Sequence, residues 1–180
     1  HQYHPSADAF RDADLVLMVG SKATIADLGA FRAEGWDIDL AAHIRRGGRV
    51  LGLCGGYQML GKRIADPHGI EGPPCEVEGL SHLDVETVMA PVKHLSVKSG
   101  THPGTGTPVS GYEIHLGETT GPDCVRAWLD IDGRPEGAAG RNGQVQGCYM
   151  HGLFGSDLFR SAYLAPMGVQ STLDFSSGVE

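Results

Sequence analysis

One cysteine sits where a strand could turn sharply into a helix. Residues 52–56 read GLCGG, with Cys54 at the centre, an apolar run at 50–53 before it and helix-forming residues at 57–60 after it. The G-x-S-x-G elbow of hydrolases exposes its corner side chain in this way, and small neighbours leave room for it. A helix that begins here would favour the thiolate, and the Gly55 N–H could donate to an oxyanion. The pattern indicates nucleophilic attack on a carbonyl. The alternative is a structural cysteine that ends a core strand.

A cysteine nucleophile needs a base, and His151 is the best candidate. Histidine titrates in the range in which a proton can be taken and returned. His151 follows a strand-like run at 145–150 and precedes a glycine, so we expect it at the carboxyl edge of a sheet. The alternative is a capping or core histidine.

Two further motifs contain polar groups in unusual settings. Residues 111–117, GYEIHLG, place Glu113 and His115 in an otherwise apolar strand. Burying them is costly unless they are paired or contact a ligand, so the choice is between a ligand site and a network that only stiffens the strand. Residues 56–63 match the phosphate-loop spacing, but Arg63 stands where that loop needs Ser or Thr, so nucleotide binding is not expected here.

The pattern of elements predicts an α/β fold. An apolar strand at 15–19 ends at Gly20-Ser21, helices are expected at 25–32 and 38–45, and the strand and elbow follow. This order favours a parallel sheet whose carboxyl edge carries the site. Later strands are expected at 83–88, 109–116, 125–131 and 145–150, and a helix from about 156 to 164. A loop is expected at 99–108 and a mobile hairpin or loop at 134–143.

Composition excludes several classes of partner and indicates a cellular compartment. The 180 residues carry a net charge of −8, which disfavours nucleic acid and anionic membranes as partners, and no apolar run is long enough to span a membrane. The four cysteines form no C-x-x-C pair, so a reducing cytoplasm is expected. No metal site is expected, because the nearest candidate pair of histidines, His1 and His4, lacks companion acids.

Five motifs in order resemble one known family. They are GSKATIADL at 20–28, LCGGYQMLG at 53–61, IADPHGIEG at 64–72, GYEIHLG at 111–117 and YMHGLF at 149–154. Together they resemble the carboxy-terminal glutaminase domain of cobyric acid synthases, over about 14–180. The resemblance implies a class I (triad-type) glutamine amidotransferase fold with three layers and a mostly parallel central sheet. It also implies that residues 1–180 are a single domain, a partial chain without the family's amino-terminal ATP-dependent ligase domain.

The resemblance also implies a catalytic scheme. Cys54 would attack the side-chain amide of glutamine, and N–H groups of Gly55 and of the Gly20-Ser21 loop would hold the oxyanion. His151 would protonate the departing ammonia and then activate water against the glutamyl thioester.

The resemblance further implies a substrate pocket and partners. Gln58, Glu113 and His115 would line the glutamine pocket. Ammonia would pass to the ligase domain, where ATP and Mg would be bound and side chains of an adenosylated corrin a,c-diamide amidated. This domain itself would hold no cofactor.

The chain departs from the family pattern at three positions. Val19 replaces a usual Pro and Ala23 a usual Asn, and Leu153 stands where most class I glutaminases have an acid two residues past the histidine. Asp157 or Glu113 could orient His151 instead. We expect an acid from the ligase domain or none, because Asp157 falls after the start of a helix.

Several other functions stay open on the sequence alone. Within the class these are the glutaminase of cobyrinate a,c-diamide synthase and the glutaminase subunit that amidates peptidoglycan precursors. Outside it they are a stand-alone cysteine hydrolase and a non-catalytic module that docks a ligase.

Overall fold

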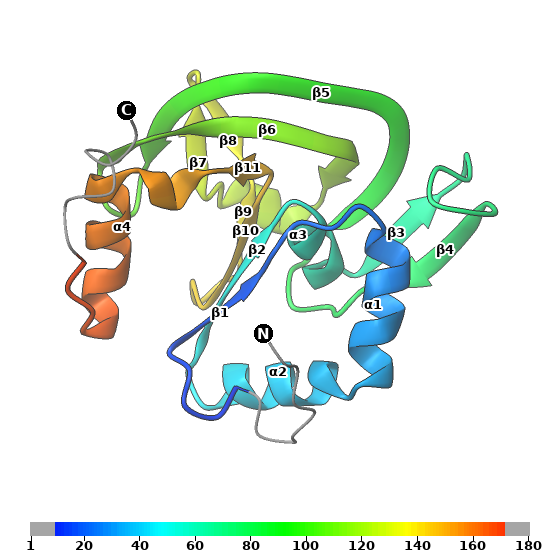
Figure 1. Cartoon of the computed structure of the whole chain (residues 1–180), viewed down its shortest axis with the longest axis horizontal. Helices are drawn as coiled ribbons and strands as arrows, with labels where there is room; N and C mark the ends of the chain where they lie inside the picture. Colours follow the sequence, from blue (N-terminus) through cyan, green and yellow to red (C-terminus); the bar gives the residue numbers. More distant parts are fainter. Residues whose placement is uncertain (1–9, 172–180) are drawn as a thin grey trace.

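The structure is a computed structural model that describes residues 10–171, with the backbone alone for 91–95. Its helices are α1 Thr24–Ala33, α2 Trp36–Arg45, α3 Gly55–Leu60 and α4 Asp157–Leu164, with short 3-10 turns η1 Pro122–Val125, η2 Leu153–Gly155 and η3 Ala165–Met167. Its strands are β1 Leu15–Met18, β2 Arg49–Leu53, β3 Arg63–Asp66, β4 Cys75–Glu78, β5 Glu86–His102, β6 Thr107–Thr120, β7 Leu129–Ile131, β8 Arg134–Glu136, β9 Ala138–Ala139, β10 Val145–Cys148 and β11 Met150–His151. Figure 1 shows their arrangement.

A small, mostly parallel sheet forms the centre of the molecule. Its strand order is β1-β2-β10-β9, with β1 and β10 parallel to β2 and β9 antiparallel at one edge. Val50 packs into the core shared with α1, α2 and α3, whereas its neighbour Leu51 packs into the core shared with α4. Because successive strand residues face opposite sides, helices cover both faces of this sheet. Figure 1 shows α1 and α4 on opposite sides of β1 and β2. The predicted α/β fold with three layers and a parallel centre is confirmed.

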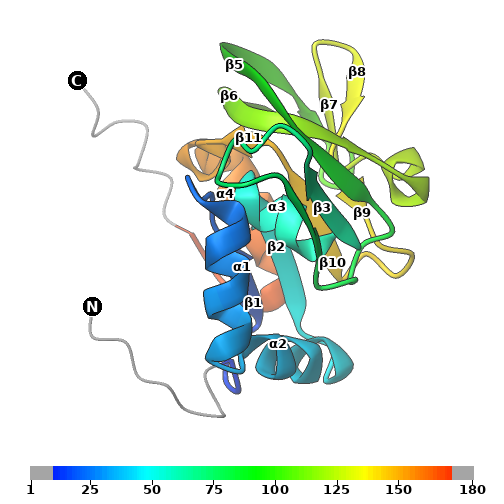
Figure 2. The ribbon, with the colours of Figure 1, turned by 90° about the vertical axis from the view of Figure 1, so that its right-hand side faces the viewer.

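A second sheet, mostly antiparallel, was not foreseen as a unit. Its order is β11-β6-β5-β3-β4, and β7 and β8 extend it from β5. Figure 2 shows β5 and β6 at the top, above α1, α2 and β1. The predicted loop at 99–108 is wrong at both ends, because Gly100 pairs with Val109 and Thr101 with Pro108 across the β5–β6 hairpin.

Other boundaries differ in smaller ways. The strand predicted at 125–131 is reduced to β7, because Pro122–Val125 forms a 3-10 turn. Residues 134–143, predicted as a hairpin or loop, contain β8 and β9, which pair antiparallel with β7 and β10 respectively. The predicted helices at 25–32 and 38–45 and the helix after Ser156 are confirmed as α1, α2 and α4. None of the helices in residues 10–171 has the length and apolar character to cross a bilayer.

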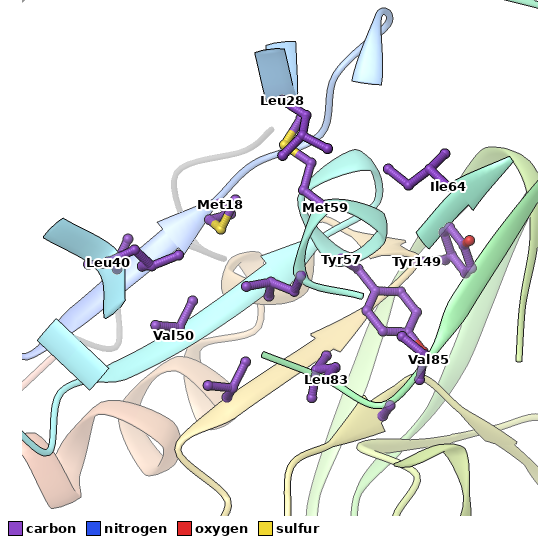
Figure 3. Packing of buried hydrophobic residues seen from close by; sticks show 14 of the residues in the cluster. Met18, Leu28, Leu40, Val50, Tyr57, Met59, Ile64, Leu83, Val85 and Tyr149 are labelled. Atoms are coloured by element: carbon purple, nitrogen blue, oxygen red, sulfur yellow. The ribbon is translucent and has the colours of Figure 1, made fainter. Parts of the chain in front are cut away.

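Helix α3 is short and entirely buried, and it holds the elbow in place. Tyr57, Met59 and Leu60 join Met18 and Leu28 in one core cluster (Figure 3). A Cβ built on Gly56 would lie 2.0 Å from the Met18 carbonyl oxygen, and one on Gly52 would lie 2.7 Å from the Tyr57 nitrogen. Only glycine allows α3 to lie this close to β1 and β2, as the small-residue pattern around Cys54 predicted.

Candidate active site

Three strand ends meet at one edge of the parallel sheet. Met18 of β1 is in register with Gly52 of β2, and Leu53 of β2 is in register with Cys148 of β10. The segments that follow these strands therefore leave the same edge. They carry the Gly20-Ser21 loop, Cys54 and His151, so the sequence correctly predicted which residues gather there.

Cys54 occupies a strained corner. Its backbone has φ 54° and ψ −114°, which a residue with a side chain rarely adopts, and α3 begins at the next residue. Such strain persists where the surroundings enforce it, and here the Cys54 N–H donates to the Cys148 carbonyl at 2.8 Å. The residue is only 8% exposed, yet it lines a cavity that opens at this edge.

Gly20 shows how closely the elbow and the histidine approach each other. A Cβ built on Gly20 would lie 3.0 Å from Cε1 of His151, 3.4 Å from Cβ of Cys54 and 3.8 Å from its Sγ. One hydrogen on Gly20 thus faces both candidate catalytic side chains. The structure brings together the predicted nucleophile, the predicted base and the predicted oxyanion loop.

This contact predicts the effect of adding one methyl group. Gly20→Ala should lower kcat for glutamine hydrolysis about 10²-fold. The added methyl would lie 3.0 Å from the His151 imidazole, so either the ring or Cys54 must move. A displacement of about 1 Å in a reacting group typically costs a factor of this size. The melting temperature should change little. Gly29→Ala in α1 is the matched control, since a Cβ there meets nothing within 4 Å. Equal activity of both variants would contradict the arrangement.

His151 is held by backbone and aromatic contacts. Its ring stacks on Tyr112 with centroids 5.1 Å apart and planes 7° from parallel. Its Nε2 is buried without a hydrogen-bond partner in the described part of the chain, so the ring's hydrogen bond to the Ile114 carbonyl comes from Nδ1. The Cys54 thiol donates to the same carbonyl at 3.4 Å. An unpartnered Nε2 in a cavity can accept a proton from a thiol or from water.

The surroundings of His151 favour the neutral ring. Burial lowers the pKa of the His151 imidazole below its ordinary 6.5, and the electrostatic influence of the nearby His115 ring acts in the same direction. The hydrogen bond to Ile114 opposes both effects. Neutral imidazole is the form that acts as a general base.

A pH profile tests this lowered pKa. Activity that needs neutral His151 is lost as the ring protonates, so the acid limb of kcat/KM for glutamine should have its midpoint below 6.5. His82→Gln is the control, because burial also lowers the pKa of His82 and this residue does not line the cavity. A midpoint above 6.5, or one that moves in the control, would contradict the assignment.

Neither acid considered as an orienter of His151 is bonded to it. Glu113 accepts from His115 Nε2 at 2.7 Å, and Asp157 accepts from Arg160 at 2.6 Å within α4. Tyr112 is paired with His151 and Glu113 with Met150, so Glu113 lies on the other side of β6 from the ring. Within residues 10–171 the hydrogen-bond partner of the His151 ring is the Ile114 carbonyl and not an acid.

The loop after β1 presents its backbone to the elbow. The Ser21 nitrogen lies 2.9 Å from the position of a Cβ on Gly55, so both proposed oxyanion donors are beside Cys54. The Ser21 hydroxyl points elsewhere, donating to Asp27 and accepting from the Ala23 N–H. Ser21 can therefore serve the site through its backbone.

The cavity at this edge has a volume of about 630 Å³ and accommodates an amino acid. Its wall is formed by Val19, Gly20, Ser21, Lys22, Thr24, Cys54, Gln58, Glu71, Met89, Ile114, His115, Leu116 and His151.

Of the predicted pocket residues, Gln58 and His115 line this cavity and Glu113 does not. The amide of Gln58 is already used: it donates to the Leu116 carbonyl at 2.9 Å and to the Tyr149 hydroxyl at 3.2 Å, and it accepts from Thr24. His115 stacks on Tyr149 at 3.7 Å, and Glu113 acts behind it as its partner. These bonds fix the wall of the cavity.

Two charged residues on the wall were not predicted as site residues. Lys22 and Glu71 stand within motifs that the sequence made visible, at 20–28 and 64–72, but without a role. No cluster of three or more His, Cys, Asp or Glu within the described ranges could hold a metal ion, and His1 and His4 lie outside those ranges.

The fold that carries the Cys54 elbow and the adjacent His151 is similar to that of solved glutamine amidotransferases. A solved structure described as glutamine amidotransferase matches 92% of this chain and 85% of its own with a TM-score of 0.62 and 16% identity. PurLQS from Thermotoga maritima matches 87% of this chain and 80% of its own with a TM-score of 0.58 and 16% identity. At this identity the likeness concerns the fold.

The sequence identifies the family. Residues 1–159 match the CobB/CobQ-like glutamine amidotransferase domain, and the chain belongs to that family. The chain is 59% identical over 169 residues to the cobyric acid synthase of Ruegeria sp. (strain TM1040) and 59% identical over 171 residues to that of Methylobacterium nodulans. Each match covers 94% of this chain but 35% of the relative, so the chain spans about a third of the length of these relatives.

Proposed function

We propose that this chain is the glutaminase part of a cobyric acid synthase, releasing ammonia from glutamine through a thioester on Cys54. The convergence of Cys54, His151 and Gly20 at one corner of the cavity carries the proposal. Membership of a glutamine amidotransferase domain family and 59% identity to cobyric acid synthases support it.

The proposed chemistry has two halves. His151 Nε2 takes the thiol proton as Cys54 Sγ attacks the amide carbon, and the N–H groups of Gly55 and Ser21 stabilise the oxyanion. Each such donor contributes about 3 kcal/mol to lowering the barrier. The proton then passes to the leaving nitrogen, which departs as ammonia. In the second half His151 takes a proton from water as the water oxygen attacks the thioester carbonyl. The C–S bond then breaks, glutamate leaves, and the proton returns to the Cys54 sulfur.

The remainder of the enzyme belongs to this proposal as well. Ammonia would pass to a ligase portion, where ATP and Mg would be bound and carboxylates of an adenosylated corrin a,c-diamide amidated. The identity to cobyric acid synthases favours this over the related diamide synthase and the peptidoglycan-directed enzyme. A cytoplasmic location completes the proposal.

The test compares glutamine hydrolysis by the chain alone and joined to the ligase portion. We expect slow hydrolysis alone and faster hydrolysis with the partner and its substrates, because amidotransferase glutaminases generally depend on their synthetase. An electrophilic glutamine analogue should form an adduct that mass spectrometry maps to Cys54. Full activity in isolation would favour a stand-alone hydrolase. No activity and no adduct, even beside the ligase portion, would favour a docking module.

A further inference from the structure

The loop between β3 and β4 is built to hold one carboxylate against the cavity. Asp66, at the end of β3, is fully buried and accepts from the Ile70 and Glu71 N–H groups at 2.9 Å each. Burial alone would raise the pKa of Asp66, but these backbone donors outweigh it and lower the pKa. An ionised buried carboxylate therefore shapes the segment that presents Glu71.

Glu71 is anchored at its far end as well. Its Oε2 accepts from the Ile25 N–H in the first turn of α1 at 2.9 Å, where the residue before the helix, Ala23, offers no capping side chain. Thr24 precedes Ile25 and lies closer to the site: its hydroxyl oxygen is 3.0 Å from the position of a Cβ built on Gly55. The Glu71 carboxylate is thus fixed to the turn that abuts the elbow, while its Oε1 has no hydrogen-bond partner in the described part of the chain.

The charges on the cavity wall are complementary to those of a free amino acid. Among the described wall residues, Glu71 is the one carboxylate and Lys22 the one lysine or arginine. Both ring nitrogens of His115 already contact Glu113 and the Gly117 carbonyl. Glutamine whose side-chain amide reaches Cys54 still has an ammonium and a carboxylate at its other end, and each needs a partner of opposite charge once removed from water.

We propose that Glu71 binds the α-ammonium of glutamine and makes the site selective for the free amino acid, with Lys22 facing the α-carboxylate. This inference rests on the proposed glutaminase function and adds a specificity residue to it. It predicts that a γ-amide without the ammonium is a poor substrate because of Glu71.

The test uses truncated substrates with the chain joined to its ligase portion. Glutaric acid monoamide lacks the α-ammonium, and 4-aminobutanamide lacks the α-carboxylate. Wild-type kcat/KM should fall about 10- to 100-fold for glutaric acid monoamide relative to glutamine, the usual range for one lost charge-assisted hydrogen bond. Glu71→Gln should lose a similar factor on glutamine, mostly in KM, and little more on the monoamide.

The controls separate recognition from helix capping. Glu71→Gln keeps an oxygen for the Ile25 N–H. If Glu71 had a purely structural role, this variant would slow glutamine and glutaric acid monoamide equally, and the ratio of their kcat/KM values would not change. Glu78→Gln, at an exposed position of β4 outside the cavity, should keep the wild-type ratio. Lys22→Met should keep that ratio and instead lose discrimination against 4-aminobutanamide.

Two outcomes would overturn the inference. One is a wild-type enzyme that hydrolyses glutaric acid monoamide as well as glutamine, a result that needs no variant to fold. The other is a Glu71→Gln enzyme that retains the full preference for glutamine. Both leave Cys54-dependent hydrolysis intact, whereas failure of the proposed thioester chemistry at Cys54 would abolish hydrolysis of every substrate.

Discussion

Replacing Cys54 with serine should lower the rate of glutamine hydrolysis by about 10⁴-fold or more, the scale on which removal of a catalytic nucleophile acts. Serine is close to cysteine in size and should tolerate the same elbow, so folding should be preserved. Its hydroxyl is far less ionised than a thiol and is a much weaker nucleophile towards an amide. The measurement is ammonia release, with the melting temperature as a check on folding.

The matched control is Cys75→Ser. Cys75 is an exposed thiol on β4, so this variant makes the same chemical change outside the cavity. It should keep full activity and still form the adduct with the electrophilic glutamine analogue, while Cys54→Ser should form none. Comparable activity in the two variants would mean that Cys54 only ends a core strand.

The parallel half of the fold and the meeting of Gly20, Cys54 and His151 at one sheet edge could be predicted because their signals are local. Apolar runs ending at Gly20 and Cys54 mark buried parallel strands, and parallel strands share one carboxyl edge. His151 follows a third such run. Register then places the three groups together, as the pairing of Leu53 with Cys148 shows. The strained backbone at Cys54 was also foreseeable from the glycines around it.

The antiparallel sheet and the orienting group could not be predicted in this way. Residues 99–108 have the Gly, Thr and Pro content of a loop, yet β5 and β6 pair there because a hairpin continues from Val97 and Tyr112. Glu71 is placed at the cavity by the hydrogen bond that its backbone N–H donates to the Asp66 carboxylate, and such a bond leaves no periodic pattern in the sequence. The hydrogen bond from His151 is to a backbone carbonyl, and no residue type signals such a partner.

Replacing His151 with alanine should lower kcat for glutamine hydrolysis about 10²- to 10⁴-fold, the usual contribution of a general acid–base residue. Both halves of the reaction need the ring, so the loss should appear in thioester formation and in its hydrolysis. Added imidazole should restore part of the rate, because the vacated space faces the cavity beside Tyr112. The restored rate should follow the concentration of neutral imidazole.

Comparison with the nearby acids decides what orients the ring. Asp157→Asn and Glu113→Gln should each keep most of the activity, because these carboxylates bind Arg160 and His115 and the ring donates to the Ile114 carbonyl. A neutral base needs its tautomer fixed, and a carbonyl that accepts from Nδ1 leaves Nε2 able to take the proton. If Asp157→Asn were as inactive as His151→Ala, an acid would be the orienting group and the role given to the Ile114 carbonyl would be wrong.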